Sequence, residues 1–399
     1  MKKTVKDIDI KNKKVIMRVD FNVPLDKETN SKITDTTRVD AAMPTIEYIL
    51  SQGASLILMS HLGRPKGEAN PKYSLKPVYD YLKTKLPNNK VIFANDCIGE
   101  EVKKTASSLN AGDVLLLENL RYHAEEEKND ANFSKQLADL ADVYVNDAFG
   151  TAHRTHASTA GIVAAKPSMP AVAGFLMEKE IKYLGDAVAE PKRPFVAIIG
   201  GAKVSSKISV LKNLLNKVDT LIVVGGMAYT FFKAKGYEIG TSLCEDDYIQ
   251  TAKEIMDKAK ELNKTLYLPI DNVVADKFDN DANRKIVDCN AIPSGWMGMD
   301  VGEKTLKEIE NILKNAKTIV WNGPLGVFEM SNFAKGTFET AKFIANSGAV
   351  SIIGGGDSVS AVNKSGVADK MTHISTGGGA SLEFLEGIEL PGIKVLQDK

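Results

Sequence analysis

The stretch PFVAIIGGAKVSSKISVLKNLLNKVDTLIVVGG, residues 194–226, decides the fold. Two short, almost continuously apolar runs, 194–201 and 220–226, enclose a segment whose apolar residues recur at helical spacing. Uninterrupted apolar runs of this length are typical of strands that are buried on both faces of a parallel sheet. The stretch therefore predicts a strand–helix–strand unit with a Gly-Gly turn after each strand.

The same pattern recurs along the chain and predicts an α/β protein. Further runs are VIMRVDF (15–21), ASLILMSH (54–61), KVIFAND (90–96), DVLLLENLR (113–121), VYVNDAF (143–149), TLYLPIDNVV (265–274), TIVWNGPLG (318–326) and VSIIGGGDS (350–358). Segments between them, such as 134–143 and 251–264, have helical spacing. Strands that alternate with helices form parallel sheets, so we expect doubly wound, Rossmann-like architecture.

The runs fall into two groups, which predicts two domains of similar size. The groups are separated by residues 160–193, where several prolines surround a helical pattern at 175–188. Proline-rich segments with few strand signals are typical of domain boundaries. We expect one domain over 1–172, a bridging hinge helix over 173–190 and a second domain over 191–375.

Composition excludes several classes of function. The 399 residues are 43% hydrophobic and 26% charged, with 51 basic and 51 acidic side chains, as in an ordinary globular protein. This zero net charge argues against nucleic acid or a membrane surface as the main partner. The longest apolar stretch, 221–232, is interrupted by glycines and is shorter than the ~20 residues of a membrane helix. The balanced charge also favours a monomer.

The cysteines and the charged N-terminus indicate a reducing compartment. Cys97, Cys244 and Cys289 are scattered and form no CxxC pair. We therefore expect neither a disulfide framework nor a zinc site, and interpret all three as packing residues. The first residues, MKKTVKD, lack an apolar signal core, which favours a cytoplasmic protein.

Arginine is scarce, and its positions predict an anion site in the first half. Seven arginines stand among the 51 basic residues, and four of them follow or flank predicted strands there: Arg38, Arg64, Arg121 and Arg154. A guanidinium binds carboxylate or phosphate through two parallel hydrogen bonds, which lysine cannot do. The alternative is that each forms a surface ion pair of little energetic value. Arg18 and Arg193 are interpreted as structural.

Glycine clusters after four predicted strands favour a phosphate site in the second half. They are Gly200-Gly201, Gly225-Gly226, Gly354-Gly355-Gly356 and Gly377-Gly378-Gly379. Glycine lets backbone N–H groups approach a phosphate, although tight turns also use it. None completes G-x-G-x-x-G, and the chain has neither a GxxxxGK[ST] loop nor an HRD loop. Dinucleotide-binding, P-loop and protein-kinase sites are therefore excluded.

Three charged residues sharpen this phosphate site. Lys203 and Lys207, four residues apart, are expected to share one face at the start of a helix. Positive charge is unfavourable there, which indicates an anionic ligand. Asp357 follows the triple glycine and is expected either to cap a helix that begins near Ser358 or to bind Mg²⁺ on a nucleotide.

Eight longer motifs resemble one family in the same order. They are VDFNVP (19–24), SHLGRP (60–65), LLENLRYHAEEEKND (116–130), NDAFGTAHRTHAS (146–158), GGAKVSSK (200–207), WNGPLGVFE (321–329), GGGDS (354–358) and STGGGASLE (375–383). Together they resemble the phosphoglycerate kinases, from the first strand to the last fifteen residues. Thr155 and Ser358 are conservative departures from the residues usual in the family.

The resemblance implies a substrate for each half of the chain. The residues implied to hold 3-phosphoglycerate or 1,3-bisphosphoglycerate are Asp20, Phe21, Asn22, Arg38, His61, Leu62, Gly63, Arg64, Arg121 and Arg154. Those implied to hold ADP or ATP with Mg²⁺ are Gly201, Lys203, Lys207, Gly225, Gly298, Asn322, Pro324, Glu329, Gly355, Gly356, Asp357 and Ser358, with Asp357 nearest the metal. The resemblance also implies that residues 376–399 return to pack on the first domain.

The implied reaction is reversible phosphoryl transfer from an acyl phosphate to ADP. In the opposite direction, ATP is the donor and a carboxyl group is the acceptor. A carboxylate needs no general base, so positioning and charge neutralisation must supply the catalysis. The groups expected to act on the transferring phosphoryl are Arg38, Lys203, Lys207, Gly355 and Gly378. We expect in-line transfer after hinge-bending closure of the two domains.

Three alternatives remain open from the residues alone. A kinase of a smaller acyl phosphate, such as acetyl phosphate, would not need four arginines. An NAD-dependent dehydrogenase would need the dinucleotide fingerprint that is missing here. A scaffold protein that binds phosphorylated ligands without catalysis could lose Lys203, Asp357 or the glycine loops, all of which are present.

Overall fold

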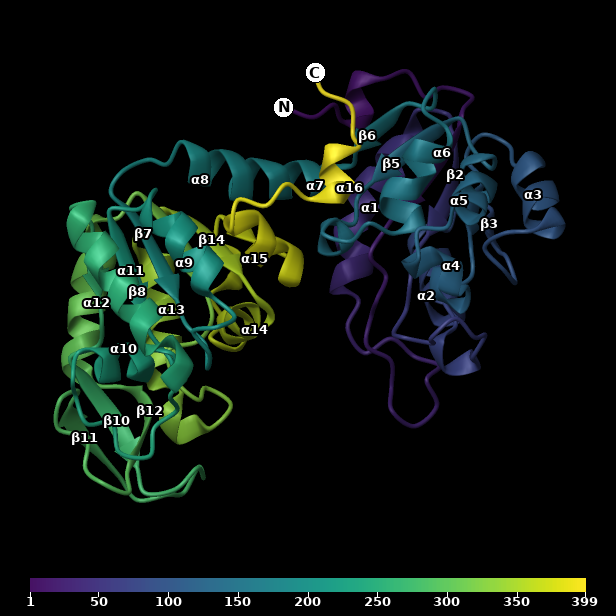
Figure 1. Cartoon of the computed structure of the whole chain (residues 1–399). Helices are drawn as coiled ribbons and strands as arrows, with labels where there is room; N and C mark the ends of the chain where they lie inside the picture. Colours follow the sequence, from purple (N-terminus) through teal and green to yellow (C-terminus); the bar gives the residue numbers. More distant parts are fainter. The chain divides into compact units, whose positions relative to one another are not determined.

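The chain forms two compact units in the computed structural model (Figure 1). The structure describes the backbone of residues 1–399 and all side chains except those of residues 186 and 187. Unit 1 comprises Met1–Ile181 and Glu389–Lys399, and unit 2 comprises Lys182–Ile388. The family resemblance implied that the chain returns to the first domain at residue 376. In the structure the return begins at Glu389. Residues before that point stay in unit 2 because α15 (Gly379–Leu385) packs on α9 (Ile208–Leu215).

Unit 1 is built on a six-stranded sheet in which every pair is parallel. Its strands, in the order β3-β4-β2-β1-β5-β6, are β1 (Lys14–Arg18), β2 (Ser55–Met59), β3 (Val91–Phe93), β4 (Val114–Leu116), β5 (Val143–Asn146) and β6 (Ala171–Ala173). Helices in this unit are α1 (Thr37–Ser51), α2 (Lys76–Lys85), α3 (Glu100–Ser107), α4 (Ala124–Glu127), α5 (Ala131–Ala138), α6 (Ile162–Ala165), α7 (Phe175–Glu180) and α16 (Pro391–Lys394). Val15 and Met17 share one core with α1 and α2, while Ile16 is buried on the other face.

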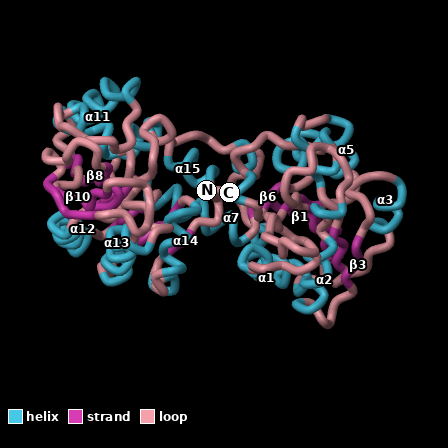
Figure 2. Tube along the Cα trace, turned by 90° about the horizontal axis from the view of Figure 1, so that it is seen from below, coloured by secondary structure: helices cyan, strands magenta, loops and turns pink.

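Unit 2 has a second parallel sheet and a small antiparallel one, shown as strands among helices in Figure 2. The parallel sheet, in the order β15-β14-β13-β7-β8-β9, contains β7 (Phe195–Ile199), β8 (Thr220–Val223), β9 (Thr265–Tyr267), β13 (Thr318–Asn322), β14 (Val350–Gly354) and β15 (His373–Ile374). The antiparallel sheet contains β10 (Asp271–Ala275), β11 (Arg284–Asp288) and β12 (Met297–Val301). Besides α9 and α15, its helices are α8 (Ala187–Ala189), α10 (Ala228–Ala234), α11 (Ile249–Glu261), α12 (Glu303–Asn315), α13 (Lys335–Asn346) and α14 (Gly356–Lys364).

The predicted α/β class with two parallel-sheet domains is confirmed, but one predicted strand is wrong. The run 265–274 divides into β9 and β10, which belong to different sheets. Pro269 stands between them and has no N–H to donate to a ladder, so the parallel pairing ends before it. The apolar runs did not predict β6, β11, β12 and β15. β6 and β15 are short, β11 is largely exposed, and β12 (MGMDV) contains Gly298 and Asp300 in place of an unbroken apolar run.

Two buried carboxylates attach the antiparallel sheet to neighbouring helices of unit 2: Asp300 on β12 accepts the Gly336 N–H of α13 at 2.8 Å, and Asp271 on β10 binds the start of α12. Asp271 on β10 is buried and accepts hydrogen bonds from the backbone N–H of Lys304 (3.0 Å) and of Thr305 (2.8 Å). The Thr305 hydroxyl donates a third bond at 2.6 Å. The first turn of α12 has no side-chain cap of its own, so Asp271 satisfies these donors from another element.

We therefore expect Asp271→Ala to lower the free energy of unfolding by about 2–4 kcal/mol, because it leaves buried donors without an acceptor. Asp288→Ala is the matched control, since Asp288 is the cross-strand partner of Asp271 on β11. Its ion pair with Lys304 is exposed, and removing it should cost less than about 1 kcal/mol. Denaturant titration of both variants measures the difference. Equal losses in the two would contradict this role for Asp271.

Candidate active site

The predicted anion-binding residues of unit 1 follow the carboxyl ends of neighbouring parallel strands. Asp20 and Asn22 follow β1, and His61 to Arg64 follow β2. Arg121 lies in the short helix η3 (Leu120–Tyr122) after β4, and Arg154 follows β5. Ligands of doubly wound sheets bind at this edge, where the loops from adjacent strands converge. The sheet order β4-β2-β1-β5 thus explains why residues far apart in sequence share one edge.

Direct contacts tie these loops together. Arg38, on the first turn of α1, forms an ion pair with Asp20 at 2.6 Å. The side-chain oxygen of Asn22 accepts a hydrogen bond from the backbone N–H of Gly63 at 2.8 Å. The guanidinium of Arg121 donates to the carbonyl oxygen of Gly63 at 3.1 Å. Gly63 therefore has contacts with the loops from β1 and β4.

The predicted residues differ in how they can meet a ligand. Arg64 and Arg154 are exposed, and the Arg38 side chain is 39% exposed, so their guanidinium groups are accessible. Phe21 and Leu62 are buried, so a ligand can contact them only through the backbone. His61 is also buried and its Nδ1 lies 3.2 Å from the guanidinium of Arg18. Burial and the neighbouring arginines Arg18, Arg121 and Arg38 hold the pKa of His61 well below its ordinary value, so this ring is neutral.

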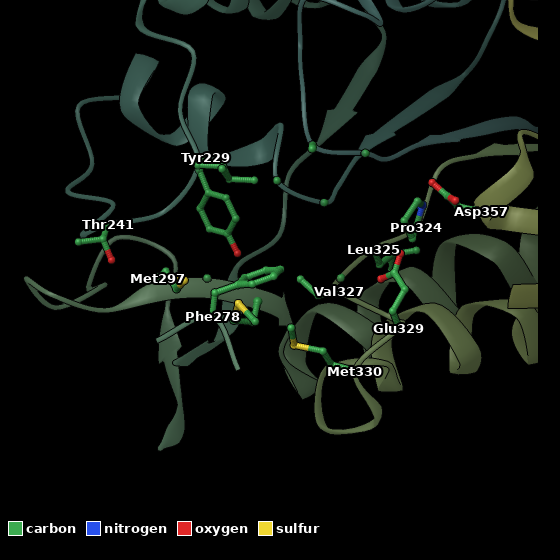
Figure 3. Close-up of a pocket in the computed structure, with 18 residues that line it drawn as sticks. Tyr229, Thr241, Phe278, Met297, Pro324, Leu325, Val327, Glu329, Met330 and Asp357 are labelled. Carbon is green, nitrogen blue, oxygen red and sulfur yellow. The ribbon is translucent and has the colours of Figure 1, made fainter. Parts of the chain in front are cut away.

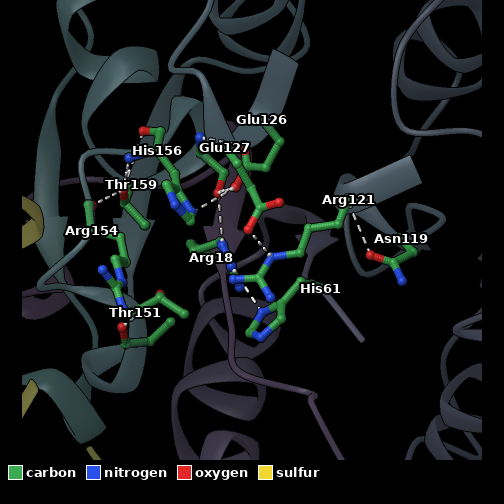
Figure 4. Close-up of polar contacts among 12 residues, drawn as sticks. Arg18, His61, Asn119, Arg121, Glu126, Glu127, Thr151, Arg154, His156 and Thr159 are labelled. Carbon is green, nitrogen blue, oxygen red and sulfur yellow. Dashed lines mark hydrogen bonds and ion pairs between the residues drawn. The ribbon is translucent and has the colours of Figure 1, made fainter. Parts of the chain in front are cut away.

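A buried charge network beneath these loops was missed by the sequence analysis (Figure 4). Arg18 is fully buried, and its Nε donates to the Ser158 hydroxyl at 2.8 Å. The Ser158 hydroxyl donates in turn to Glu126, which also accepts the Ser158 backbone N–H at 2.9 Å. Glu126 is the buried carboxyl group near Arg18 and Arg121; burial raises its pKa, and Arg18, the Ser158 hydrogen bonds and Arg121 oppose that rise. The segment AEEEKND (124–130) has the composition of a solvent-exposed helix, so nothing in the sequence distinguished Glu126 from the neighbouring glutamates.

Glu126→Gln should lower the free energy of unfolding by at least about 2 kcal/mol, because it leaves the buried Arg18 charge without a nearby anion. Glu125→Gln changes an exposed residue on the same short helix and should have almost no effect. Denaturation curves of the two variants test this difference. A Glu126→Gln protein as stable as the parent would show that the network does not depend on this charge.

In unit 2, the predicted glycine loops meet at the switch point of the sheet. Strand order reverses between the neighbouring strands β7 and β13, which is where such sheets bind ligands. Gly200 follows β7, and a Cβ placed on it would come within 2.2 Å of the Pro324 carbonyl oxygen. Only glycine permits this approach of the two loops. The two loops line two adjoining cavities.

The first cavity is an apolar slot of about 710 Å³ (Figure 3). Tyr229, Phe278 and Met297 lie around one end, while Glu329 and Asp357 lie toward the other. Apolar walls with a few polar groups are typical of sites for a flat organic ring. The predicted residues Gly201, Gly225, Gly298, Pro324, Glu329 and Asp357 all line this cavity. Gly298 is needed there because a Cβ would overlap the Tyr229 ring.

The second cavity, of about 470 Å³, is the more polar of the two because Lys203, Lys207 and Asn322 line it, and we call it the polar cavity. It shares Gly201, Ala202, Pro324 and Asp357 with the first. The predicted residues lining it are Gly201, Lys203, Lys207, Asn322, Pro324, Gly355, Gly356, Asp357 and Gly378. Gly355 and Gly378 are the N-caps of α14 and α15, and helix N-termini present unpaired N–H groups to anions. Ser358 is buried below this cavity, where its hydroxyl accepts the Gly323 N–H at 2.6 Å.

Two local expectations for this cavity are wrong. Lys203 and Lys207 do not share the face of a helix, because α9 begins only at Ile208 and Lys207 is its N-cap. Glu245 holds the preceding turn in place by accepting the backbone N–H (3.0 Å) and the hydroxyl (2.6 Å) of Ser205. Asp357 does not cap α14 either, since Gly355 occupies that position and Asp357 lies in the first turn.

The lysines nevertheless provide positive charge to the polar cavity. Lys207 Nζ donates to Asn322 Oδ1 at 2.7 Å, and burial lowers the pKa of Lys207. Lys203 is exposed at the same cavity. Two cations, a helix N-terminus and bare glycine backbone form a site for a polyanion next to a slot for a ring. Unit 2 therefore has the features of a nucleotide site, and the class of protein defined by both units is a phosphotransferase.

Comparison with known proteins identifies the family. The family model described as phosphoglycerate kinase matches residues 5–388. A phosphoglycerate kinase of Clostridium botulinum is 58% identical over 400 residues, covering 100% of this chain and 99% of that protein. A cytosolic phosphoglycerate kinase of Arabidopsis thaliana is 58% identical over 99% of this chain and 98% of its own.

Solved structures agree with this result. The phosphoglycerate kinase of Coxiella burnetii superposes with a TM-score of 0.90 at 41% identity, covering 99% of this chain and 98% of that one. The enzyme of Pyrococcus horikoshii gives 0.81 at 34% identity, with 98% of each chain covered. The chain belongs to the phosphoglycerate kinase family. None of the described helices has both the length and the apolar content needed to cross a membrane.

Proposed function

We propose that this chain catalyses reversible phosphoryl transfer from 1,3-bisphosphoglycerate to ADP, giving 3-phosphoglycerate and ATP, a glycolytic reaction. The main support for the proposal is that each unit has features suited to a different substrate. Unit 1 presents arginines at one sheet edge, and unit 2 has an apolar slot beside a polar, glycine-lined cavity. Family membership supports both substrates.

Unit 1 would bind the phosphoglycerate through its arginines. Arg64 and Arg154 offer exposed forked donors that suit a carboxylate or phosphate group. Arg121, whose side chain is 13% exposed and paired with Glu127, would add a partly engaged third donor. Asp20, which pairs with Arg38, would accept a hydrogen bond from the substrate hydroxyl. Asn22, whose oxygen accepts the Gly63 N–H, would donate one from its NH₂ group. His61, as a neutral ring, can contribute a hydrogen bond without adding charge. This combination favours a substrate with a distal phosphate over a smaller acyl phosphate.

Unit 2 would bind the nucleotide with its base in the apolar slot and its phosphates in the polar cavity. Glu329 lies along the slot and is placed to accept hydrogen bonds from the ribose hydroxyls. Lys203, Lys207 and the N–H groups around Gly355 would contact the phosphates. Asp357 is exposed, lines both cavities and fits Mg²⁺, which usually takes one or two carboxylates together with phosphate oxygens. The bound metal would neutralise phosphate charge.

The chemistry needs charge stabilisation and alignment more than proton transfer. The attacking or leaving oxygen belongs to a carboxylate, which carries no proton at neutral pH. Arg38 and Lys203 would stabilise the equatorial oxygens of the phosphoryl group during transfer, and Lys207 with the N–H groups near Gly355 and Gly378 would hold the nucleotide end. The reacting atoms must come within about 3–3.5 Å. We therefore propose that binding of both substrates draws the units together and excludes water.

The reaction is tested with 3-phosphoglycerate and Mg-ATP, with glyceraldehyde-3-phosphate dehydrogenase and NADH reporting the acyl phosphate formed. Loss of NADH that requires both substrates and Mg²⁺ is expected. Acetate or carbamate in place of 3-phosphoglycerate should give no reaction. Nucleotide binding without turnover of 3-phosphoglycerate would contradict the proposed substrate.

We also propose that the protein is a monomer and acts in the cytoplasm.

Arg38→Ala should lower kcat at least about 100-fold with little change in the KM for ADP, because it removes a donor that acts on the transferring group. Arg38→Lys should also be poor, since an ammonium group lacks the bidentate fork. Arg284→Ala, an exposed change on β11, is the control and should be silent. Steady-state kinetics of the three variants decide the matter. Near-normal turnover in Arg38→Ala would exclude its catalytic role.

Asp357→Asn should raise the Mg²⁺ concentration needed for half-maximal activity and the KM for the nucleotide, by more than about tenfold. The KM for 3-phosphoglycerate should change little, because that ligand binds to unit 1. Asp369→Asn changes an exposed carboxylate of the same unit and should leave the Mg²⁺ dependence as it was. Titration of activity with Mg²⁺ at fixed nucleotide measures both. An unaltered Mg²⁺ dependence in Asp357→Asn would remove Asp357 from the metal site.

A further inference from the structure

Three side chains with metal-binding chemistry meet in unit 1, and the reaction proposed above uses none of them. Asp96, Cys97 and His123 offer one oxygen, one sulfur and one nitrogen atom, and these atoms all lie within 4.8 Å of one another. Asp96 and Cys97 follow β3, and His123 follows η3 after the adjacent strand β4. Parallel pairing of β3 with β4 therefore brings together residues that the sequence separates.

We propose that Asp96, Cys97 and His123 form a binding site for a thiophilic divalent transition-metal ion of the Zn²⁺ class. Thiolate, imidazole and carboxylate are the protein ligands of zinc, at about 2.0–2.3 Å from the metal. Three protein ligands leave the fourth tetrahedral position for water. The three atoms lie within 4.8 Å of one another and would have to move to reach these distances from a common ion. The spacing of the cysteines did not predict such a site, because the motif is assembled by the fold.

Two of the three ligands are already oriented. His123 Nε2 lies 2.7 Å from Asp96 Oδ1, and the same oxygen accepts the Cys97 backbone N–H at 2.6 Å. The His123 ring packs against Phe133 with centroids 5.4 Å apart, which limits its rotation. An ion entering the cluster would replace the Asp96–His123 hydrogen bond and would not need to order free side chains.

The cluster can be reached from solvent. The Asp96 side chain is 49% exposed and that of His123 is 27% exposed, while Cys97 is buried. A cavity of about 300 Å³ adjoins Asp96 and is also lined by Gly99, Glu100 and Glu101. Cys97 and His123 do not line this cavity, so an ion would reach the cluster over the exposed parts of Asp96 and His123. The buried thiol would then be the innermost ligand of the site.

The electrostatic surroundings also favour a cation. Asp96 and Glu125 act on His123, and Asp96 and Glu126 act on Cys97, so acidic groups dominate the surroundings of both. Burial and these anions raise the pKa of the Cys97 thiol well above its ordinary value. A dication would reverse this effect, since a coordinating thiol loses its proton. Binding therefore replaces the S–H bond by a sulfur–metal bond and releases that proton to solvent, so affinity should fall on acidification.

The experiment is a titration of the chelator-treated, full-length protein with Co²⁺, which reports thiolate ligation by a charge-transfer band in the near ultraviolet. We expect this band in the parent protein, its displacement by Zn²⁺, and its loss in Cys97→Ser. His123→Gln should raise the apparent dissociation constant more than about tenfold. The double variant Cys244→Ser, Cys289→Ser is the control. It should keep the band, because both of these thiols belong to unit 2 and the proposed site belongs to unit 1.

The readout requires no turnover, so its failure is distinguishable from failure of the proposed reaction. Absence of a band in the parent protein at millimolar Co²⁺ would overturn the proposal even if a variant did not fold. A band that survives in Cys97→Ser and disappears in the Cys244, Cys289 double variant would also overturn it. Unchanged affinity in folded His123→Gln would remove the imidazole ligand and with it the proposed site.

Discussion

The close approach of two backbone loops at the switch point of the second sheet is the constraint on which the nucleotide-type site depends. Gly200 lies against the Pro324 carbonyl group, so the loops after β7 and β13 cross without side chains between them. These loops line both the apolar slot and the polar cavity, and Gly201, Ala202, Pro324 and Asp357 are common to the two. A ligand that is part ring and part polyanion matches this arrangement. A side chain at Gly200 would separate the loops and disrupt both cavities together.

In unit 1 the corresponding constraint is electrostatic: buried charges must be balanced beneath the surface loops. Its accessible arginines stand above a buried arginine, Arg18, whose charge is compensated through Ser158 by Glu126. Without a buried anion, the mutual repulsion of Arg18 and Arg121 would favour spreading of the loops. The low pKa of His61 has the same origin, since burial and nearby arginines exclude a further positive charge. Exposed positive charge is thus left to Arg64 and Arg154 at the carboxyl edge of the sheet.

The sequence predicted the parallel sheets, the glycine loops and the nearby Lys203, Lys207 and Asp357 for identifiable reasons, whereas Gly298, Asn322, Pro324 and Glu329 followed only from the family resemblance. Strands buried on both faces, such as β2 and β7, produce unbroken apolar runs, and the loops after them must lie at one sheet edge. What it could not predict depends on tertiary contacts. Glu126 is one of three consecutive glutamates, and only the fold shows that it is the buried one. The start of α9 was placed too early because Glu245, forty residues away, holds Ser205 in a turn. The β9–β10 division depended on Pro269, whose effect on pairing was overlooked.

The central claim is that one ligand binds to each unit and that transfer requires both units to come together. Small-angle X-ray scattering of the full-length protein with no ligand, with 3-phosphoglycerate, with a non-hydrolysable Mg-nucleotide and with both ligands tests it most directly. The account predicts the smallest radius of gyration when both ligands are bound, and a smaller change with either alone. An unchanged radius of gyration in the ternary complex, with binding of both ligands verified, would contradict it.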